Sequence, residues 1–240
     1  MFDLPIDHSY NIQNSSPVSH YEWAAEMHFQ PSNAATTALA FRHMDETPDG
    51  WCSKLKAYWM MNFIFLKNPK VIVEIGVWAG KSLIPMARAV KDLGEGGKVY
   101  GIDPWSADAS VIGMDNDNIA FWKNQQAHEQ IYQELRTRIK VFGLDDTVQL
   151  VRAKSEDASI IANIDILHID GNHSEEMSFK DVVRWVPEVV SGGLIFLDDL
   201  TWTIDGKPSV QKAMDWLDEH CIRLTEVPDV DNHWGIWVKK

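Results

Sequence analysis

From residue 70 onward, short apolar runs alternate with longer amphipathic stretches. The run Val71–Ile75 is rich in β-branched residues and ends at Gly76, which is typical of a strand buried on both faces. The same reasoning predicts strands at 98–102, 147–151, 165–169, 194–197, 222–227 and 233–238, and helices at 81–93, 127–141, 155–161, 174–190 and 209–220.

This alternation of strands and helices predicts an α/β fold built from right-handed βαβ units. We therefore expect a doubly wound, mostly parallel, Rossmann-like sheet of seven strands. The last two strands are joined without a helix, which predicts one antiparallel edge strand.

The first fifty residues follow a different pattern. They hold four prolines and many polar residues, with no clear strand, and short helices are predicted at 21–28 and 34–43. We interpret residues 1–50 as a helical extension or lid and residues 51–240 as the main domain. That domain opens with a predicted helix at 51–67, which is apolar on most faces and therefore buried.

Composition narrows the class of protein. The 240 residues are 45% hydrophobic and 24% charged, which excludes a disordered or fibrous chain. With 22 basic and 35 acidic residues, the net charge of −13 argues against a nucleic-acid or anionic-membrane partner. Eleven tryptophans suit an aromatic-lined pocket for a small molecule. The sequence leaves open whether the chain forms a homo-oligomer.

Targeting and redox signals are sparse. Cys52 and Cys221 are far apart and lack the spacing of a metal site. No Lys or Arg precedes Arg42, so we expect neither a secretory signal nor a transit peptide. The most apolar stretch, 57–66, is too short to span a bilayer and contains Asn62. These features predict a cytoplasmic protein.

Carboxylates recur where the predicted parallel strands end. In an open parallel sheet the ligand lies beyond these carboxyl ends. The segments at this edge are 74–82, 103–105, 153–156, 170–173 and 198–202, and each contains an acidic residue. Clustered like charges repel one another, so this concentration indicates a ligand site.

The segment 73–82 contains the first candidate loop. Gly76 and Gly80 are separated by three residues, which is not the G-x-G-x-x-G spacing of a dinucleotide site. Glu74 would repel a pyrophosphate and attract an ammonium group, whereas the start of the following helix suits an anion. A ligand with both an amino group and a carboxylate would satisfy both. Further along, Asp103 ends the second strand, where a ribose diol is often held.

These motifs resemble the class I S-adenosylmethionine-dependent methyltransferases, and within them the metal-dependent small-molecule O-methyltransferases that act on catechols and macrolide sugars. The resemblance covers residues 70–202 and implies that the cofactor is S-adenosylmethionine. It implies roles for Glu74 at the methionine amino group, Gly76, Val77, Trp78 and Gly80 along the cofactor, Ser82 at its carboxylate, Asp103 at the ribose, and Ser155 and Glu156 at the adenine. Trp78 departs from the pattern, because a third glycine is more usual there. Ser155 is equally well explained as a helix cap.

A second acidic group follows the fourth and fifth strands. Asp170, Asp198 and Asp199 should converge, and three close carboxylates are stable only if they are protonated or bridged by a cation. We therefore predict a divalent metal, Mg²⁺ by the resemblance, on these three residues, although solvated turn residues are the alternative. The resemblance places a catalytic base three residues after the first ligand, which is His173 here. Asp170 is predicted to serve the chemistry beside it and to border the cofactor, whereas His168 is a weaker candidate.

The predicted activity is metal-assisted O-methylation of a hydroxyl on a sugar, phenol or natural product. Trp105, Trp122 and Trp202 are expected either to shape the acceptor pocket or to pack in the core. Two alternatives remain open at this point. One is a natural-product hydroxylase on the same fold, and the other is a non-catalytic protein that binds S-adenosylmethionine.

Overall fold

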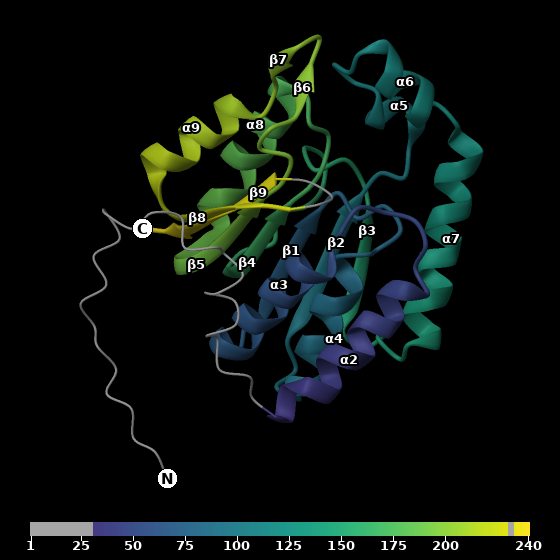
Figure 1. The fold of residues 1–240 in the computed structure, drawn as a ribbon, viewed down its shortest axis with the longest axis vertical. Coiled ribbons are helices and arrows are strands. Elements are labelled where there is room, and N and C mark those ends of the chain that lie inside the picture. The colour runs from purple at the N-terminus through teal and green to yellow at the C-terminus, as the bar shows by residue number, and fades with distance from the viewer. Residues whose placement is uncertain (1–30, 230–232) are drawn as a thin grey trace.

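The computed structural model describes residues 31–229 and 233–240. Its main helices are α2 (Pro31–Asp45), α3 (Lys54–Lys67), α4 (Leu83–Leu93), α7 (Gln125–Val141), α8 (Glu175–Trp185) and α9 (Gln211–His220). The strands are β1 (Val71–Ile75), β2 (Lys98–Asp103), β3 (Val148–Arg152), β4 (Ile164–Ile169), β5 (Val189–Leu197), β8 (Cys221–Pro228) and β9 (His233–Lys239). The shorter elements are the helices α5 (Ala107–Ser110) and α6 (Asn116–Trp122), the 3-10 helix η1 (Val186–Glu188), and a hairpin of β6 (Thr203–Ile204) and β7 (Lys207–Pro208) (Figure 1).

The seven long strands form one sheet in the order β3-β2-β1-β4-β5-β9-β8. The pairings among β1 to β5 are parallel, whereas β9 runs antiparallel to both β5 and the edge strand β8. The predicted doubly wound sheet with antiparallel pairing at one edge is therefore confirmed. The strand order reverses at β1 and β4, which places the switch point of the sheet in its centre.

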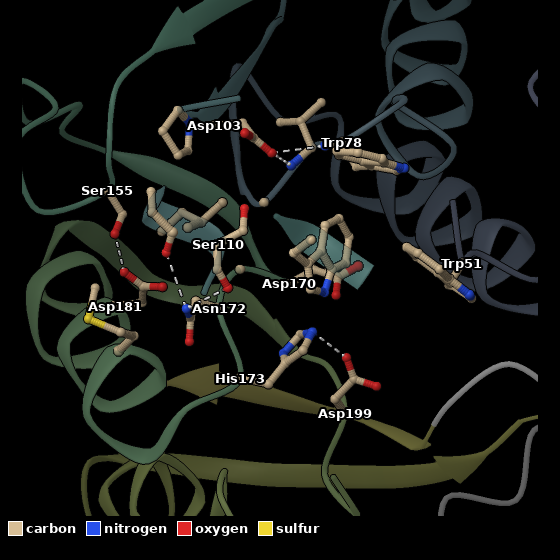
Figure 2. A pocket seen from close by; sticks show the side chains of 18 of the residues that line it. Trp51, Trp78, Asp103, Ser110, Ser155, Asp170, Asn172, His173, Asp181 and Asp199 are labelled. Carbon is tan, nitrogen blue, oxygen red and sulfur yellow. Dashed lines mark hydrogen bonds and ion pairs between the residues drawn. The ribbon is translucent and has the colours of Figure 1, made fainter. Parts of the chain in front are cut away.

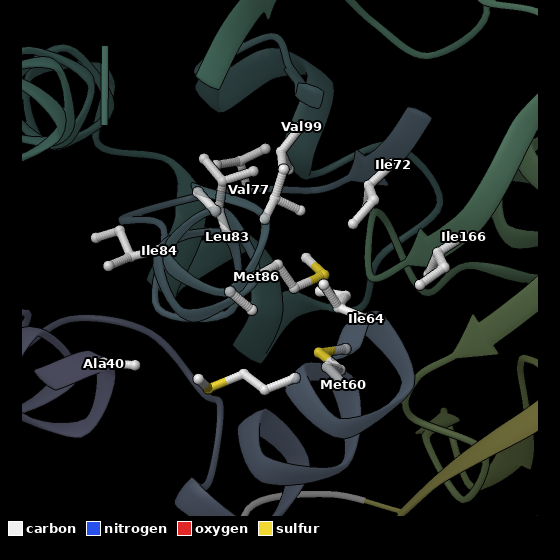
Figure 3. Close-up of a cluster of buried hydrophobic side chains, with 14 of the residues drawn as sticks. Ala40, Met60, Ile64, Ile72, Val77, Leu83, Ile84, Met86, Val99 and Ile166 are labelled. Carbon is white, nitrogen blue, oxygen red and sulfur yellow. The ribbon is translucent and has the colours of Figure 1, made fainter. Parts of the chain in front are cut away.

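Helices cover both faces of the sheet because successive side chains of a buried strand point to opposite sides. On one face, Ile72 of β1 packs with α3, α4 and α7 around Ile64 and Met86 (Figure 3). On the other face, Val73 packs with α8 and α9 around Trp185 and Leu217. Each face is an apolar core, which explains why the strands read as continuous hydrophobic runs.

The described part of the N-terminal extension packs on the domain. The predicted helix at 34–43 is confirmed within α2, which contacts α3 and α4. Ala40 is fully buried, Thr36 donates a hydrogen bond to Asp92 at 2.7 Å, and His43 stacks on Phe142 with ring centroids 3.9 Å apart. The predicted helix at 21–28 lies outside the described residues, and the division at residue 50 stays a prediction.

One predicted helix is wrong, and another is too long. Residues 155–161 form turns instead of a helix, and Arg184 donates to the carbonyl groups of Ser155 at 3.0 Å and Ala158 at 2.7 Å. The helix predicted to reach residue 190 ends at Trp185, because Pro187 lacks the N–H needed to continue it. Strand β5 then begins at Val189, so the glycines at 192 and 193 lie inside a strand instead of ending a helix.

The other predicted elements in the described residues differ from the observed ones by only a few residues at their ends. Helix α3 begins at Lys54, where the side chain of Ser53 accepts the N–H of Lys56 as an N-cap.

Among the described residues, no helix combines the length and the apolar character needed to cross a bilayer.

Candidate active site

A cavity of about 540 Å³ opens beyond the carboxyl ends of β1, β2 and β4, at the switch point of the sheet. This volume lies within the range of small-molecule sites. Residues from the predicted strand ends line it, among them Gly76, Asp103, Ser155, Asp170 and His173 (Figure 2). The strand-end argument therefore located the cavity correctly.

Asp103 organises the loop after β1. Its Oδ2 accepts the backbone N–H groups of Val77 at 2.9 Å and Trp78 at 3.0 Å, and its Oδ1 accepts that of Trp105 at 2.6 Å. Burial raises the pKa of Asp103, although these three N–H groups act in the opposite direction. Trp78 adopts a left-handed backbone conformation, with φ of 48°, that these bonds help to hold. Val77, Trp78 and Asp103 all line the cavity.

Glu74 lies behind this loop and does not line the cavity. Its Oε1 accepts the hydroxyl of Ser82 at 2.5 Å and lies 2.8 Å from Nδ1 of His168. Burial raises the pKa of Glu74 to about 8. Its Oε2 is buried and has no hydrogen-bond partner in the part of the chain that the structure describes. Ser82, predicted at the cofactor carboxylate, does line the cavity. It therefore lies between the cavity and Glu74, which was predicted at the amino group.

The two glycines of the loop have different surroundings. Gly76 lines the cavity, and a Cβ there would lie 1.9 Å from the backbone oxygen of Asp170. Gly80 is not among the lining residues, and a Cβ there would lie 2.5 Å from Leu135 of α7. Gly76 thus allows the crossing of the β1 and β4 loops, and Gly80 allows close packing of α7.

The predicted adenine pair is split by the structure. Ser155 lines the cavity and its hydroxyl donates to Asp181 of α8 (Figure 2). Glu156 is absent from the lining and faces Lys154 at 3.9 Å and Lys180 at 3.7 Å. Asp181 lines the cavity instead, and burial raises its pKa to about 7. Asp181 was not predicted from the sequence. The signal that could have revealed it is its position, since it falls in register with the buried apolar residues of α8.

At the opposite side of the cavity, Asp170, His173 and Asp199 come together, with one ligand atom of each within 4.8 Å of the others. His173 Nε2 lies 2.7 Å from Oδ2 of Asp199. Burial lowers the pKa of His173, but the adjacent Asp199 carboxylate outweighs it, so the pKa is raised. Burial also raises the pKa of Asp170 to about 6.

Asp198 turns away from this group into the protein interior. It receives the ammonium of Lys56, and its Oδ2 lies 3.1 Å from Nε2 of His168. Lys56 is fully buried in α3, and its Nζ also lies 3.5 Å from Oδ2 of Asp170. The sequence reasoning missed Lys56, although a lysine among the buried positions of an apolar helix is a detectable signal.

The three carboxylates predicted to bind magnesium are therefore not one group. The structure forms two overlapping groups that share Asp170, one with His168 and Asp198 and one with His173 and Asp199. The predicted trio does not fit a shared divalent ion, because the ammonium of Lys56 already contacts Asp198 beside Asp170.

Aromatic side chains from three segments form a wall at the cavity, which we call the aromatic wall: Trp51, Trp78, Phe121 and Trp122. The ring of Trp51 lies 5.8 Å from that of Phe121 and 5.7 Å from that of Trp122, and Trp78 lies 4.9 Å from Trp122. Trp51 is 49% exposed and Phe121 is 60% exposed, so both offer open ring surface to a ligand.

The tryptophans singled out in the sequence divide into two kinds. Trp122 and Trp202 line the cavity, and the ring of Trp202 lies 5.3 Å from His173. Trp105 is a core residue whose indole N–H donates to the carbonyl of Trp78 at 2.9 Å. Asn172 also lines the cavity and donates to the carbonyl of Ser110 at 3.2 Å, which ties the segment after β2 to the loop after β4 (Figure 2).

The sheet is doubly wound, and an acid at the end of its second strand holds the loop that follows the first strand. This arrangement is typical of Rossmann-like enzymes that bind nucleotide ligands. The family model described as "Methyltransferase domain" matches residues 73–200, which is more than half of the chain. The chain therefore belongs to this methyltransferase family. A search of curated proteins found no significant match.

Solved structures share the fold over nearly the whole chain. An O-methyltransferase from Bacillus cereus in complex with S-adenosylhomocysteine has a TM-score of 0.57 at 14% identity and covers 92% of this chain and 97% of its own. An S-adenosylhomocysteine-bound methyltransferase from Podospora anserina has a TM-score of 0.58 at 17% identity, covering 100% and 99%. The O-methyltransferase of tomaymycin synthesis from Streptomyces achromogenes, in complex with S-adenosylmethionine, has a TM-score of 0.57 at 15% identity, covering 92% and 95%.

Proposed function

We propose that this protein transfers the methyl group of S-adenosylmethionine to a hydroxyl oxygen of a small molecule. The observation that carries the proposal is the single cavity that joins the Asp103-held loop at one end to the His173–Asp199 pair at the other. The first end suits a nucleoside with an amino-acid tail, and the second suits proton removal from an acceptor. The solved O-methyltransferases that share the fold support the same reaction class.

The residues of the site supply alignment and proton transfer. S-adenosylmethionine, when bound, supplies a methyl group on a positively charged sulfur. His173 accepts the hydroxyl proton, and Asp199 orients the imidazole and stabilises its protonated form. The acceptor oxygen would then take the methyl group as the bond between carbon and sulfur breaks, with the sulfur keeping the bonding electrons. Alignment of acceptor and methyl donor in one cavity supplies a large part of the rate enhancement.

We propose that the cofactor roles fall on the residues that face the cavity. Asp103 and Ser82 would hold the ribose and the carboxylate, and Ser155 with Asp181 would border the adenine. The buried Oε2 of Glu74, which has no hydrogen-bond partner among the described residues, supports a donor such as an ammonium group nearby, although Glu74 acts from behind the loop. The open rings of the aromatic wall support a flat, uncharged acceptor such as a phenol or a sugar face.

Calorimetric titration with S-adenosylhomocysteine tests the proposal. We expect one site per chain, and a screen of phenols, sugars and glycosides should yield products heavier by one methylene group. His173→Asn should retain this binding and reduce turnover by about 10²- to 10⁴-fold, because the general base is lost. His220→Asn, on α9 outside the cavity lining, is the matched control and should change neither quantity. Absence of S-adenosylhomocysteine binding, or products heavier by one oxygen, would refute the proposal.

A further inference from the structure

Lys56 is a basic side chain placed among the acids of the site without reaching the cavity. It projects from α3, whose other buried residues are apolar, and its side chain is fully buried. It contacts Asp198 directly and lies 3.5 Å from Asp170. A charged amine that is removed from water is stable only when opposite charges compensate it, so this pairing is a requirement of the fold.

Each carboxylate of the rim already has a basic partner. Asp198 and Asp170 share the ammonium of Lys56, and Asp199 has His173 at 2.7 Å. The physical reason to expect a divalent ion was the mutual repulsion of three bare carboxylates. That repulsion is relieved here by side chains of the protein itself.

The positions of the atoms also disfavour a metal at Asp198. A magnesium ion binds oxygen at about 2.0–2.1 Å and retains several water molecules. Oδ2 of Asp198 carries the Lys56 ammonium, which also lies 3.5 Å from Oδ2 of Asp170, so an ion bound between these two oxygens would lie against a positive charge. The other oxygen, Oδ1, is buried without a hydrogen-bond partner among the described residues, and Asp198 does not line the cavity, so Oδ1 offers no ligand atom to an ion held in the cavity.

We infer that Lys56 is the resident cation of this rim and that the site operates without a divalent metal. In this arrangement Lys56 is a positioning residue. It fixes Asp170 at the floor of the cavity and holds Asp198 in the interior, which leaves the His173–Asp199 pair to face the acceptor. The inference concerns the same site as the proposed function, but metal binding can be measured without any methyl transfer.

Manganese serves as the probe because its electron paramagnetic resonance signal falls when the free ion is bound. Wild-type protein, with or without S-adenosylhomocysteine, should leave the Mn²⁺ signal unchanged. Lys56→Met removes the internal cation, so one Mn²⁺ per chain should now bind between Asp170 and Asp198. Lys54→Met is the matched control, since Lys54 lies on the same helix but pairs with Asp45 at the surface, and it should behave as wild type.

Two results would overturn the inference. The first is one Mn²⁺ bound per wild-type chain: its loss in Asp198→Asn would make Asp198 a metal ligand, and its retention would place the ion on Asp170, His173 and Asp199. The second is a folded Lys56→Met variant that leaves the Mn²⁺ signal unchanged, which would mean that Lys56 is not what excludes the ion. If Lys56→Met fails to fold, the wild-type titration alone decides. Calorimetry with S-adenosylhomocysteine separates this outcome from a failure of the proposed function.

Discussion

At the scale of single residues, two adjacent acids have opposite environments. Asp198 faces the interior and Asp199 faces the cavity, where it meets His173. The change of direction coincides with a left-handed backbone at Asp199, with φ of 56°. Aspartate tolerates this conformation better than most residues, because its short polar side chain can bond locally. A pair of acids after a strand therefore need not act as a pair.

Asp181 makes the stability of the protein depend on pH. Burial raises its folded-state pKa from an ordinary value of 3.8 to about 7, so the folded form binds a proton more tightly than the unfolded form does. Its contribution is fully present below pH 3.8 and is lost as the pH rises through about 7, at up to about 1.4 kcal/mol per pH unit. Asp181→Asn should therefore gain stability relative to wild type as the pH rises from 5 to about 8.

Urea denaturation at pH 5 and at about pH 8 measures this difference. Asp157→Asn is the control, because Asp157 is exposed near the same loop, and its stability should follow that of wild type at both pH values. A difference between Asp181→Asn and wild type that does not change with pH would contradict the assigned protonation.

The sequence predicted site residues where the chemistry is local to a strand end. Asp103 and Ser82 were found because each follows a strand or opens a helix at the ligand edge. Lys56 was not found, because its partner Asp198 is 142 positions away and only the packing of α3 brings them together. The magnesium prediction had the same limitation. The sequence gives the number of acids at the strand ends, but only the tertiary structure shows which basic side chains pair with them.

At the scale of elements, buried strands were easier to predict than the segments that join them. The predicted strands β1 and β4 match the observed ones closely, because burial on both faces leaves a mostly apolar run of residues. The turns at 155–161 were mistaken for a helix, because Arg184 satisfies their carbonyl groups from another helix. Such a tertiary hydrogen bond leaves no local pattern.

The crossing of the β1 and β4 loops gives a prediction about two glycines. Gly76 and Gly94 have similar positive φ values, 82° and 70°, so alanine is strained at both by about 1–2 kcal/mol. A Cβ at Gly94 meets open space, whereas one at Gly76 would overlap the backbone oxygen of Asp170. Gly76→Ala should therefore lose at least about 4 kcal/mol of unfolding free energy or fail to fold. Gly94→Ala should lose only the strain, and equal losses in chemical denaturation would contradict this account.

At the scale of the whole molecule, part of the acidic excess behind the net charge of −13 is concentrated in one place. Five of the acids singled out in the sequence lie at one edge of the sheet, and four of them are paired with Lys56, His168 or His173. The apolar cores on both faces hold these elements together, and α2 adds to one of them through Ala40. Helix α2, the described part of the N-terminal extension, therefore contributes to the core of the domain.

The aromatic wall joins parts of the chain that are distant in sequence. Trp51 precedes α3 and Phe121 belongs to α6, yet their rings lie 5.8 Å apart at the cavity. Because both rings are half-exposed and the Asp103-held loop is a separate part of the cavity, we expect the wall to bind the acceptor and not the cofactor. Trp51→Ala combined with Phe121→Ala should lower kcat/KM for the acceptor identified in the screen by about tenfold, as expected for lost aromatic contacts.

The affinity for S-adenosylhomocysteine should stay within about twofold of wild type in this double variant, since uncoupled sites add independently. Trp216→Ala is the matched control, because Trp216 stacks on His220 in α9 and does not line the cavity. Acceptor kinetics and calorimetry on the same preparations separate the two ends of the cavity. An equal loss of affinity for both ligands would mean that the wall supports the whole site, and the assignment of acceptor recognition to residues 51 and 121 would then be wrong.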